Sequence, residues 1–214
     1  MKHLLIATLM MIAAQAADLR VTVYGQERIP KEVSNSAFTD LRQIFRESGI
    51  DIEFVTGDPT AAEASLLTSP ATPRKGTERV FACRARRDIA LEIVAVYPAV
   101  RKGTILGMAE PFASEGLNAR VFNDHVLDAA NRQGRSHASV LAHAIAHEIG
   151  HVLLRSSVHT SRGLMSAVWG DHEYGQMARS LMFFNGTQAK AMRAVLSGEN
   201  CQGAGTPASA LLSK

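Results

Sequence analysis

The sequence lacks the features that indicate binding to nucleic acid or insertion into a membrane. Its 214 residues carry a formal net charge of only +3, an excess too small to predict a nucleic-acid partner. After the N-terminal stretch, no segment approaches the roughly 20 consecutive apolar residues that a membrane span needs. The chain also has no internal repeat. A composition of 46% hydrophobic and 20% charged residues therefore predicts a single globular domain, residues 17–214, which we expect to be a monomer.

The first 16 residues have the pattern of a secretory signal peptide. Lys2 supplies the positive start, residues 4–13 are apolar, and residues 14–16 read Ala-Gln-Ala, a small-x-small cleavage site. We expect a secreted or periplasmic protein with no stable membrane insertion after cleavage. An uncleaved anchor or a buried helix is the alternative. No cysteine stands at the cleavage site, which argues against a lipid-anchored lipoprotein.

Cysteine is scarce, since the chain contains only Cys83 and Cys201. An exported protein matures in an oxidising compartment, where one disulfide between these two residues would tie down the C-terminal tail. Two unpaired cysteines are an equally good interpretation, because the sequence contains no information on the distance between them.

The spacing of apolar residues predicts an α/β (α+β) fold. A strand, an amphipathic helix that opens with cap-type residues at 34–36 and stops at Gly49, and a second strand begin the chain, as in a crossover between parallel neighbours. Residues 57–79 are rich in Pro, Thr, Ala and Ser and predict a surface loop. The remaining expected elements are a buried strand at 89–98, two short strands within 103–112 and 116–126, a long helix from 136 or 139, and helices at 172–184 and 187–197.

The long helix carries the sequence HEIGH at residues 147–151. Residues four apart project from the same face of a helix, so His147 and His151 can reach one metal ion. Glu148 stands between them, where a carboxylate can hold and deprotonate a metal-bound water. Zn²⁺ suits this set because it accepts imidazole nitrogen and acidifies bound water. The alternative is that these are ordinary histidines of a helix.

Two further histidines are candidates for a third ligand. His143 lies one turn before His147, but three side chains spread over eight residues span about 12 Å, too far for one ion. His159 lies eight residues after His151 and can reach the metal only if the helix ends near Leu154 and the chain turns back. Serines at 156 and 157 favour such a turn without forcing it.

With these residues in place, the sequence resembles the metzincin zinc peptidases. His147, Glu148 and His151 match HExxH, and the stretch HTSRGLMSA resembles the segment that joins the third ligand to the Met-turn. The resemblance covers about residues 105–170. It implies one catalytic Zn²⁺, His159 as third ligand and Met165 beneath the metal. It also implies a mixed, mostly parallel twisted sheet with an antiparallel edge strand, an active-site helix and C-terminal helices.

The sequence departs from the family pattern in the turn after the helix. The family places a glycine at position 154 and the third histidine at 157, where this chain has Leu154 and Ser157. The turn to His159 is therefore two residues longer and has no glycine. A carboxylate from Glu173 or Asp171 is the alternative third ligand, and a site with two histidines or no activity is a further one.

We therefore expect a zinc-dependent metalloendopeptidase that acts on a peptide or protein substrate, with Glu148 as general base. One alternative is an exported zinc-binding or protein-binding module without turnover. Another keeps hydrolysis but changes the substrate to a non-peptide amide or a cell-wall peptide.

We also expect Gly150 to serve close packing, because a glycine inside a helix costs about 1 kcal/mol against alanine. Ordinary core filling is the alternative role for Met165, and Trp169 and Tyr174 are candidates to line a substrate pocket.

Overall fold

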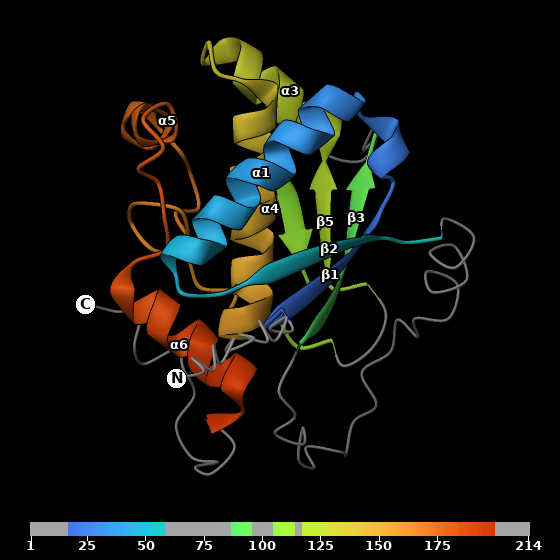
Figure 1. Cartoon of the computed structure of the whole chain (residues 1–214). Coiled ribbons are helices and arrows are strands. Elements are labelled where there is room, and N and C mark those ends of the chain that lie inside the picture. The colour runs from blue at the N-terminus through green and yellow to red at the C-terminus, as the bar shows by residue number, and fades with distance from the viewer. Residues whose placement is uncertain (1–16, 59–86, 96–104, 114–116, 200–214) are drawn as a thin grey trace, which may run out of the picture.

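The computed structural model describes residues 17–58, 87–95, 105–113 and 117–199 (Figure 1). The expected signal peptide, most of the expected loop at 57–79, and both cysteines lie outside the described residues. In the described part of the chain, no helix is long and apolar enough to cross a membrane.

Five strands form one mixed sheet in the order β2-β1-β3-β5-β4. All neighbours pair in parallel except β4, which runs antiparallel to β5 at one edge. This arrangement confirms the fold class that the sequence predicted. The bounds of the strands are β1 Leu19–Tyr24, β2 Ile52–Thr56, β3 Asp88–Val94, β4 Gly107–Ala109 and β5 Ala119–Phe122.

Alternation of apolar residues on the central strands gives the sheet one buried face. Alternate residues of β1 and β3, such as Val21 and Leu91, are fully buried, whereas Arg20 is exposed. The helices α1 (Lys31–Glu47) and α4 (His137–Leu154) pack against each other over this region (Figure 1). The core therefore lies between these two helices and the sheet.

The crossover from β1 through α1 to β2 joins parallel neighbours, as the sequence predicted. The helix ends as expected, because Gly49 has a φ of +69°, the left-handed conformation that commonly stops a helix. Its predicted start was wrong. The helix begins at Lys31 after Pro30, with Glu32 in its first turn, and Ser34 is a buried residue inside it.

One helix was missed and another was predicted too long. The expected strand at 116–126 is the short β5 followed directly by α3 (Asn123–Arg132), without an intervening turn. Of the expected helix at 172–184, only α5 (Asp171–Met177) is helical, because Ser180 takes a left-handed φ of 53°. The last helix, α6 (Gly186–Ser197), lies where it was expected.

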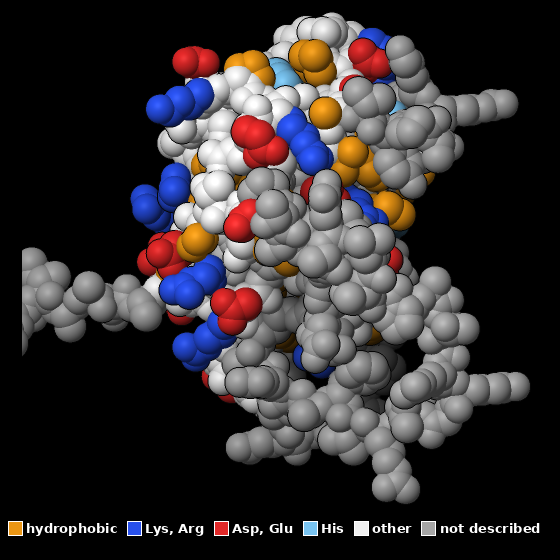
Figure 2. All heavy atoms as spheres, turned by 90° about the vertical axis from the view of Figure 1, so that its right-hand side faces the viewer, with side chains coloured by type: hydrophobic (Ala, Val, Ile, Leu, Met, Phe, Trp, Pro, Cys, Tyr) orange, Lys and Arg blue, Asp and Glu red, His pale blue; other side chains and the backbone are white. Residues whose placement is uncertain are grey.

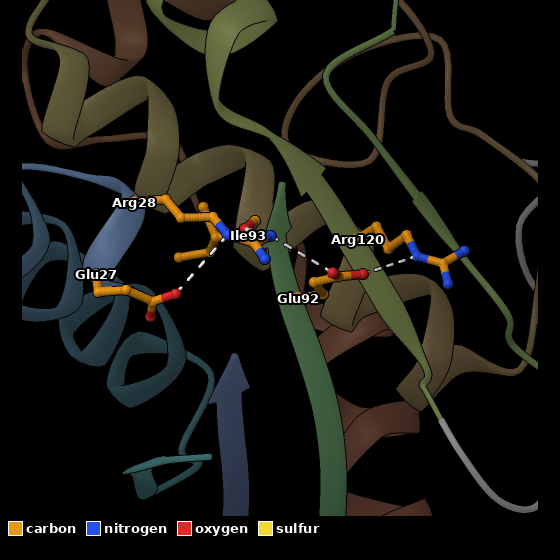
Figure 3. Close-up of polar contacts among 5 residues, drawn as sticks. All are labelled: Glu27, Arg28, Glu92, Ile93 and Arg120. Carbon is orange, nitrogen blue, oxygen red and sulfur yellow. Dashed lines mark hydrogen bonds and ion pairs between the residues drawn. The ribbon is translucent and has the colours of Figure 1, made fainter. Parts of the chain in front are cut away.

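A charged cluster fastens the middle of the sheet to the segment after β1. Glu92 of β3 accepts a hydrogen bond from Arg120 Nε of β5 at 3.1 Å and lies 3.6 Å from Arg28 Nη1 (Figure 3). Arg28 belongs to the short 3-10 helix η1 (Gln26–Arg28) and also donates to the carbonyl of Ile93. Because Glu92 is 9% exposed, its charge needs these partners. The cluster holds β5, and through it the edge strand β4, in register with the rest of the sheet.

The molecular surface seen from the right of Figure 1 mixes both signs of charge. Figure 2 shows lysine and arginine side chains next to aspartate and glutamate side chains on this side of the molecule. Arg20 of β1 and Glu53 of β2 form an exposed ion pair, with 3.3 Å between Nε and Oε2.

Candidate metal centre

Helix α4 presents His147 and His151 to the same cleft, one turn apart. Their Nε2 atoms lie 3.0 Å from each other, and both side chains are buried. The helix starts at the N-cap Ser136, whose hydroxyl accepts from Ser139 N. Nearly every residue of α4 after its first turn is buried. The two histidines are therefore held on a rigid element that the core surrounds.

The chain turns back at the end of α4 and brings His159 to this pair. The helix ends at Leu154, where the sequence required it to end for His159 to approach. His159 Nε2 lies 3.2 Å from His151 Nε2, and the ring of His159 stacks on that of His147. Ligand atoms of the three histidines all lie within 4.8 Å of one another, the one such group of three or more among the described His, Cys, Asp and Glu residues.

Backbone carbonyls fix which nitrogen of two of these rings carries a proton. His147 Nδ1 donates to Leu164 O and His151 Nδ1 donates to Ser156 O, each at 2.7 Å. Because a carbonyl oxygen can only accept, the proton of each neutral ring is on Nδ1 and Nε2 carries a bare lone pair. Two lone pairs 3.0 Å apart repel each other unless a cation lies between them.

The protonation of the rings agrees with metal binding. Burial lowers the pKa of His147 to about 4, the bond to Leu164 opposes this shift, and the neighbouring His151 and His159 add to it. Burial also lowers the pKa of His151. Neutral imidazoles are the form that binds metals. A tetrahedral ion with nitrogen at 2.0–2.1 Å separates its ligand atoms by about 3.3 Å, which is close to the 3.0 and 3.2 Å observed for the two nitrogen pairs that include His151.

Glu148 lies beside the three histidines and is 6% exposed. Burial raises the pKa of its carboxyl group to about 8. It faces the edge strand at Gly107, where an added Cβ atom would lie 2.8 Å from Glu148 Oε1 and 2.6 Å from the carbonyl oxygen of Arg120. A glycine is therefore required at 107 for the edge strand to pass this close to the carboxylate.

The histidines and Glu148 open into a cleft of about 450 Å³. One wall is the edge strand and its flanks, from Ile105 to Pro111, and the opposite wall is the segment from Ser157 to Trp169. Trp169 and Tyr174 both line the cleft, as the sequence suggested. Trp169 Nε1 donates to Leu164 O at 3.3 Å and its ring meets His147 edge to face.

The turn that contains Met165 packs against α4. Met165 is 1% exposed, its carbonyl accepts from Thr160 N at 2.9 Å, and Ser166 N donates to Gly163 O. A Cβ atom at Gly150 of α4 would lie 2.6 Å from Met165 Sδ. Gly150 thus has the close-packing role expected from the sequence, and the neighbours that require it are Met165 and Phe184.

Glu173, the alternative third ligand, has another role in the structure. Its carboxylate accepts from Gly163 N at 3.2 Å and from Gly170 N at 3.1 Å. Burial raises the pKa of this carboxyl, but the backbone N–H groups outweigh it and the net shift is downward. Neither Glu173 nor Asp171 belongs to the histidine group. Glu173 instead ties the turn before Met165 to the start of α5.

The structure places the other histidines of the described chain outside the group. His143 Nδ1 donates to Ser139 O at 2.7 Å, one turn back on its own helix. His125 of α3 is almost fully buried, and its Nδ1 donates to Ile105 O at 2.6 Å. No pattern in the sequence signals this contact, since it joins α3 to a residue before the edge strand.

Comparison with known proteins bears on the fold of this chain alone. No protein-family model matches the sequence, and no curated protein matches it. The structure is similar to archaemetzincin from Methanopyrus kandleri, with a TM-score of 0.50, 15% identity, and coverage of 87% of this chain and 99% of the other. It is also similar to a zinc-dependent peptidase from Methanocorpusculum labreanum, with a TM-score of 0.45, 14% identity, and coverage of 81% and 99%. The first likeness shows that the chain has an archaemetzincin-like fold.

Proposed function

We propose that this chain is a secreted zinc-dependent metalloendopeptidase, with His147, His151 and His159 as ligands of one Zn²⁺ and Glu148 as general base. The observation that carries the proposal is the convergence of three imidazole nitrogens beside a buried carboxylate. The archaemetzincin-like fold supports it.

When bound, zinc would supply Lewis acidity to a substrate carbonyl and lower the pKa of a water molecule. The carbonyls of Leu164 and Ser156 orient His147 and His151 for ligation through Nε2. A bound cation would favour the ionised form of Glu148 and so oppose the effect of burial on its pKa. In that form its carboxylate accepts the proton of the attacking water and passes it to the leaving amine nitrogen.

The substrate would bind as an extended peptide along β4. This strand is at the edge of the sheet, so its side away from β5 offers backbone hydrogen bonds to another strand. Phe122 N donates to Leu106 O and Glu110 N donates to Asn118 O. These bonds hold both ends of the short strand in place, and Gly107 lies next to Glu148.

Metal analysis tests the ligands. We expect about one zinc per chain in the wild type, loss of zinc in His159→Ala, and retention of zinc in Glu173→Ala, because Glu173 binds backbone N–H groups. Retention in His159→Ala with loss in Glu173→Ala would reverse the assignment. Thermal melts of all three proteins control for unfolding.

Peptide hydrolysis tests the general base. Glu148→Gln keeps the shape of the side chain, so zinc content should remain near one while hydrolysis of a broad peptide library falls by about 10²–10⁴. Full activity in this variant would refute the role of Glu148. Zinc binding by the wild type without cleavage of any peptide would favour a non-catalytic module, and cleavage of cell-wall peptides alone would change the substrate.

Export is the second part of the proposal. The basic and apolar stretch before Ala-Gln-Ala supports cleavage after residue 16. Expression in a bacterial host should yield an exported chain that begins at residue 17 by N-terminal sequencing. An uncleaved chain retained with the membrane would contradict this part and leave the metal site unaffected.

A further inference from the structure

One end of the cleft carries a positive charge that the hydrolytic mechanism does not use. Arg132, the last residue of α3, lines the cleft and is exposed. Among the described residues that line it, Arg132 is the one lysine or arginine. Ala129 and Ala144, from α3 and α4, line the same cleft with small side chains. Space is therefore available there for a substrate side chain.

Tyr174 of α5 adds a second hydrogen-bond donor at this end. It lines the cleft and is 6% exposed. Burial raises the pKa of its phenol, and the positive charge of Arg132 acts against that shift. Both side chains line the same cleft. Figure 1 shows α3 and α5 near the same end of α4. An N–H donor and an O–H donor that line one cleft can each bind an oxygen of the same carboxylate.

The direction of a bound peptide decides which of its residues meet this pair. Antiparallel pairing is slightly more stable than parallel pairing, so a peptide on β4 would run from the Ala109 end toward the Ile105 end. Its scissile bond would lie near Gly107, beside Glu148. His125, in the first turn of α3, is bonded to Ile105 O at the start of β4, and Ala129 and Arg132 further along α3 line the same cleft as Ile105 and Leu106. Residues after the scissile bond would therefore run toward α3.

We propose that Arg132 and Tyr174 form a subsite for a carboxylate on the C-terminal side of the scissile bond. The group it takes is either an Asp or Glu side chain or the free C-terminus of the peptide, since both present the same two oxygens. The inference rests on the proposed peptidase function. It adds to that function a substrate class, peptides that are anionic after the cleaved bond.

The test compares matched peptides that differ only in one charge. One pair has Asp or Asn at the first or second position after the scissile bond, and the other has a C-terminal acid or amide. We expect kcat/KM to be about fivefold to tenfold higher for the carboxylate member of at least one pair. Arg132→Gln should remove this preference, Arg132→Glu should reverse it in favour of the uncharged member of the pair, and Tyr174→Phe should reduce it.

Arg135→Gln is the matched control, because Arg135 is exposed, lies three residues further on and does not line the cleft. It should keep the wild-type preference. Cleavage with equal kcat/KM for both members of both pairs would overturn the subsite and leave the peptidase function intact. Survival of the preference in Arg132→Gln would overturn the subsite as well.

A binding measurement keeps the two proposals distinct if no peptide is cleaved. Fluorescence anisotropy with zinc-loaded Glu148→Gln measures the Kd of the same peptides without turnover. We expect a roughly fivefold to tenfold lower Kd for the carboxylate peptide, lost when Arg132→Gln is added and kept when Arg135→Gln is added. Equal Kd values within each pair would overturn the subsite. Absence of cleavage by the wild type with this preference intact would count only against the peptidase function.

Discussion

Substituting alanine at Gly150 tests how closely α4 packs on the turn that contains Met165. The added Cβ atom would lie 2.6 Å from Met165 Sδ and 2.7 Å from Phe184 Cε1. Ordinary contacts of this kind are about a full ångström longer. Met165 and Phe184 are both buried in the core, so neither side chain can move into solvent to relieve the overlap.

Two opposing effects set the size of the change. Alanine in a helix interior is favoured over glycine by about 1 kcal/mol. Overpacking a buried site costs about 1–3 kcal/mol. The net free energy of unfolding should therefore fall by up to about 2 kcal/mol. Leu164, adjacent to Met165, orients His147 through its carbonyl, so displacement of the turn should also weaken zinc binding by about tenfold.

Gly175 provides the matched control for this substitution. It lies inside α5, and a Cβ atom there would meet nothing within 4 Å. Gly175→Ala should therefore gain up to about 1 kcal/mol of stability and keep wild-type zinc affinity. Denaturant titration and zinc competition with a chelator measure the two effects in both variants. If Gly150→Ala is as stable as Gly175→Ala and binds zinc as the wild type does, the packing argument is wrong.

Three other substitutions test separate contacts. Gly107→Ala would bring a Cβ within 2.8 Å of Glu148 Oε1, so we expect at least about tenfold lower hydrolysis with an unchanged circular dichroism spectrum. A misfolded variant or full activity would contradict this. Arg155→Val should lower the free energy of unfolding by about 1–2 kcal/mol in denaturant because its φ of 48° is costly for a β-branched residue, whereas Arg155→Gly should not. Burial lowers the pKa of His143 below 6.5, so protonation favours the unfolded chain and stability falls as pH drops from 6.5 toward the folded pKa. His143→Gln should flatten that part of the stability profile by up to about 1.4 kcal/mol per pH unit, and an unchanged slope would count against this origin.

Elements with an unbroken apolar period could be predicted from the sequence. The alternation in β1, the stripe in α1 and the length of α4 all follow from residues that are buried together. Helix α3 was missed because β5 runs into it at Phe122 without a glycine, a proline or a side-chain cap. Its apolar positions 126, 129 and 130 have helical spacing, but the β-branched and aromatic residues just before them favour a strand.

The site could be predicted only as far as local geometry determines it. His147, Glu148 and His151 share a helix, so their spacing fixes how they face the cleft. The approach of His159 depends on where the helix stops, and Glu173 stayed an alternative on its chemistry until its backbone partners were known. No pattern in the sequence marks Arg132 as a residue of the cleft, because only the packing of α3 against α4 brings it there.

The turn after α4 is two residues longer than in the metzincin pattern, and it contains an arginine in the left-handed conformation that usually requires glycine. Arg155 takes the left-handed conformation, Arg155 N donates to Val152 O, and Ser156 N donates to His151 O, which together form a Schellman end. The Ser156 hydroxyl then accepts from Val158 N and its carbonyl accepts from His151 Nδ1. One residue therefore both orients His151 and starts the segment that carries His159. Because these tasks are coupled, a change in the conformation of the turn would disturb both histidines together, and a glycine at 154 is not needed to bring the third one into reach.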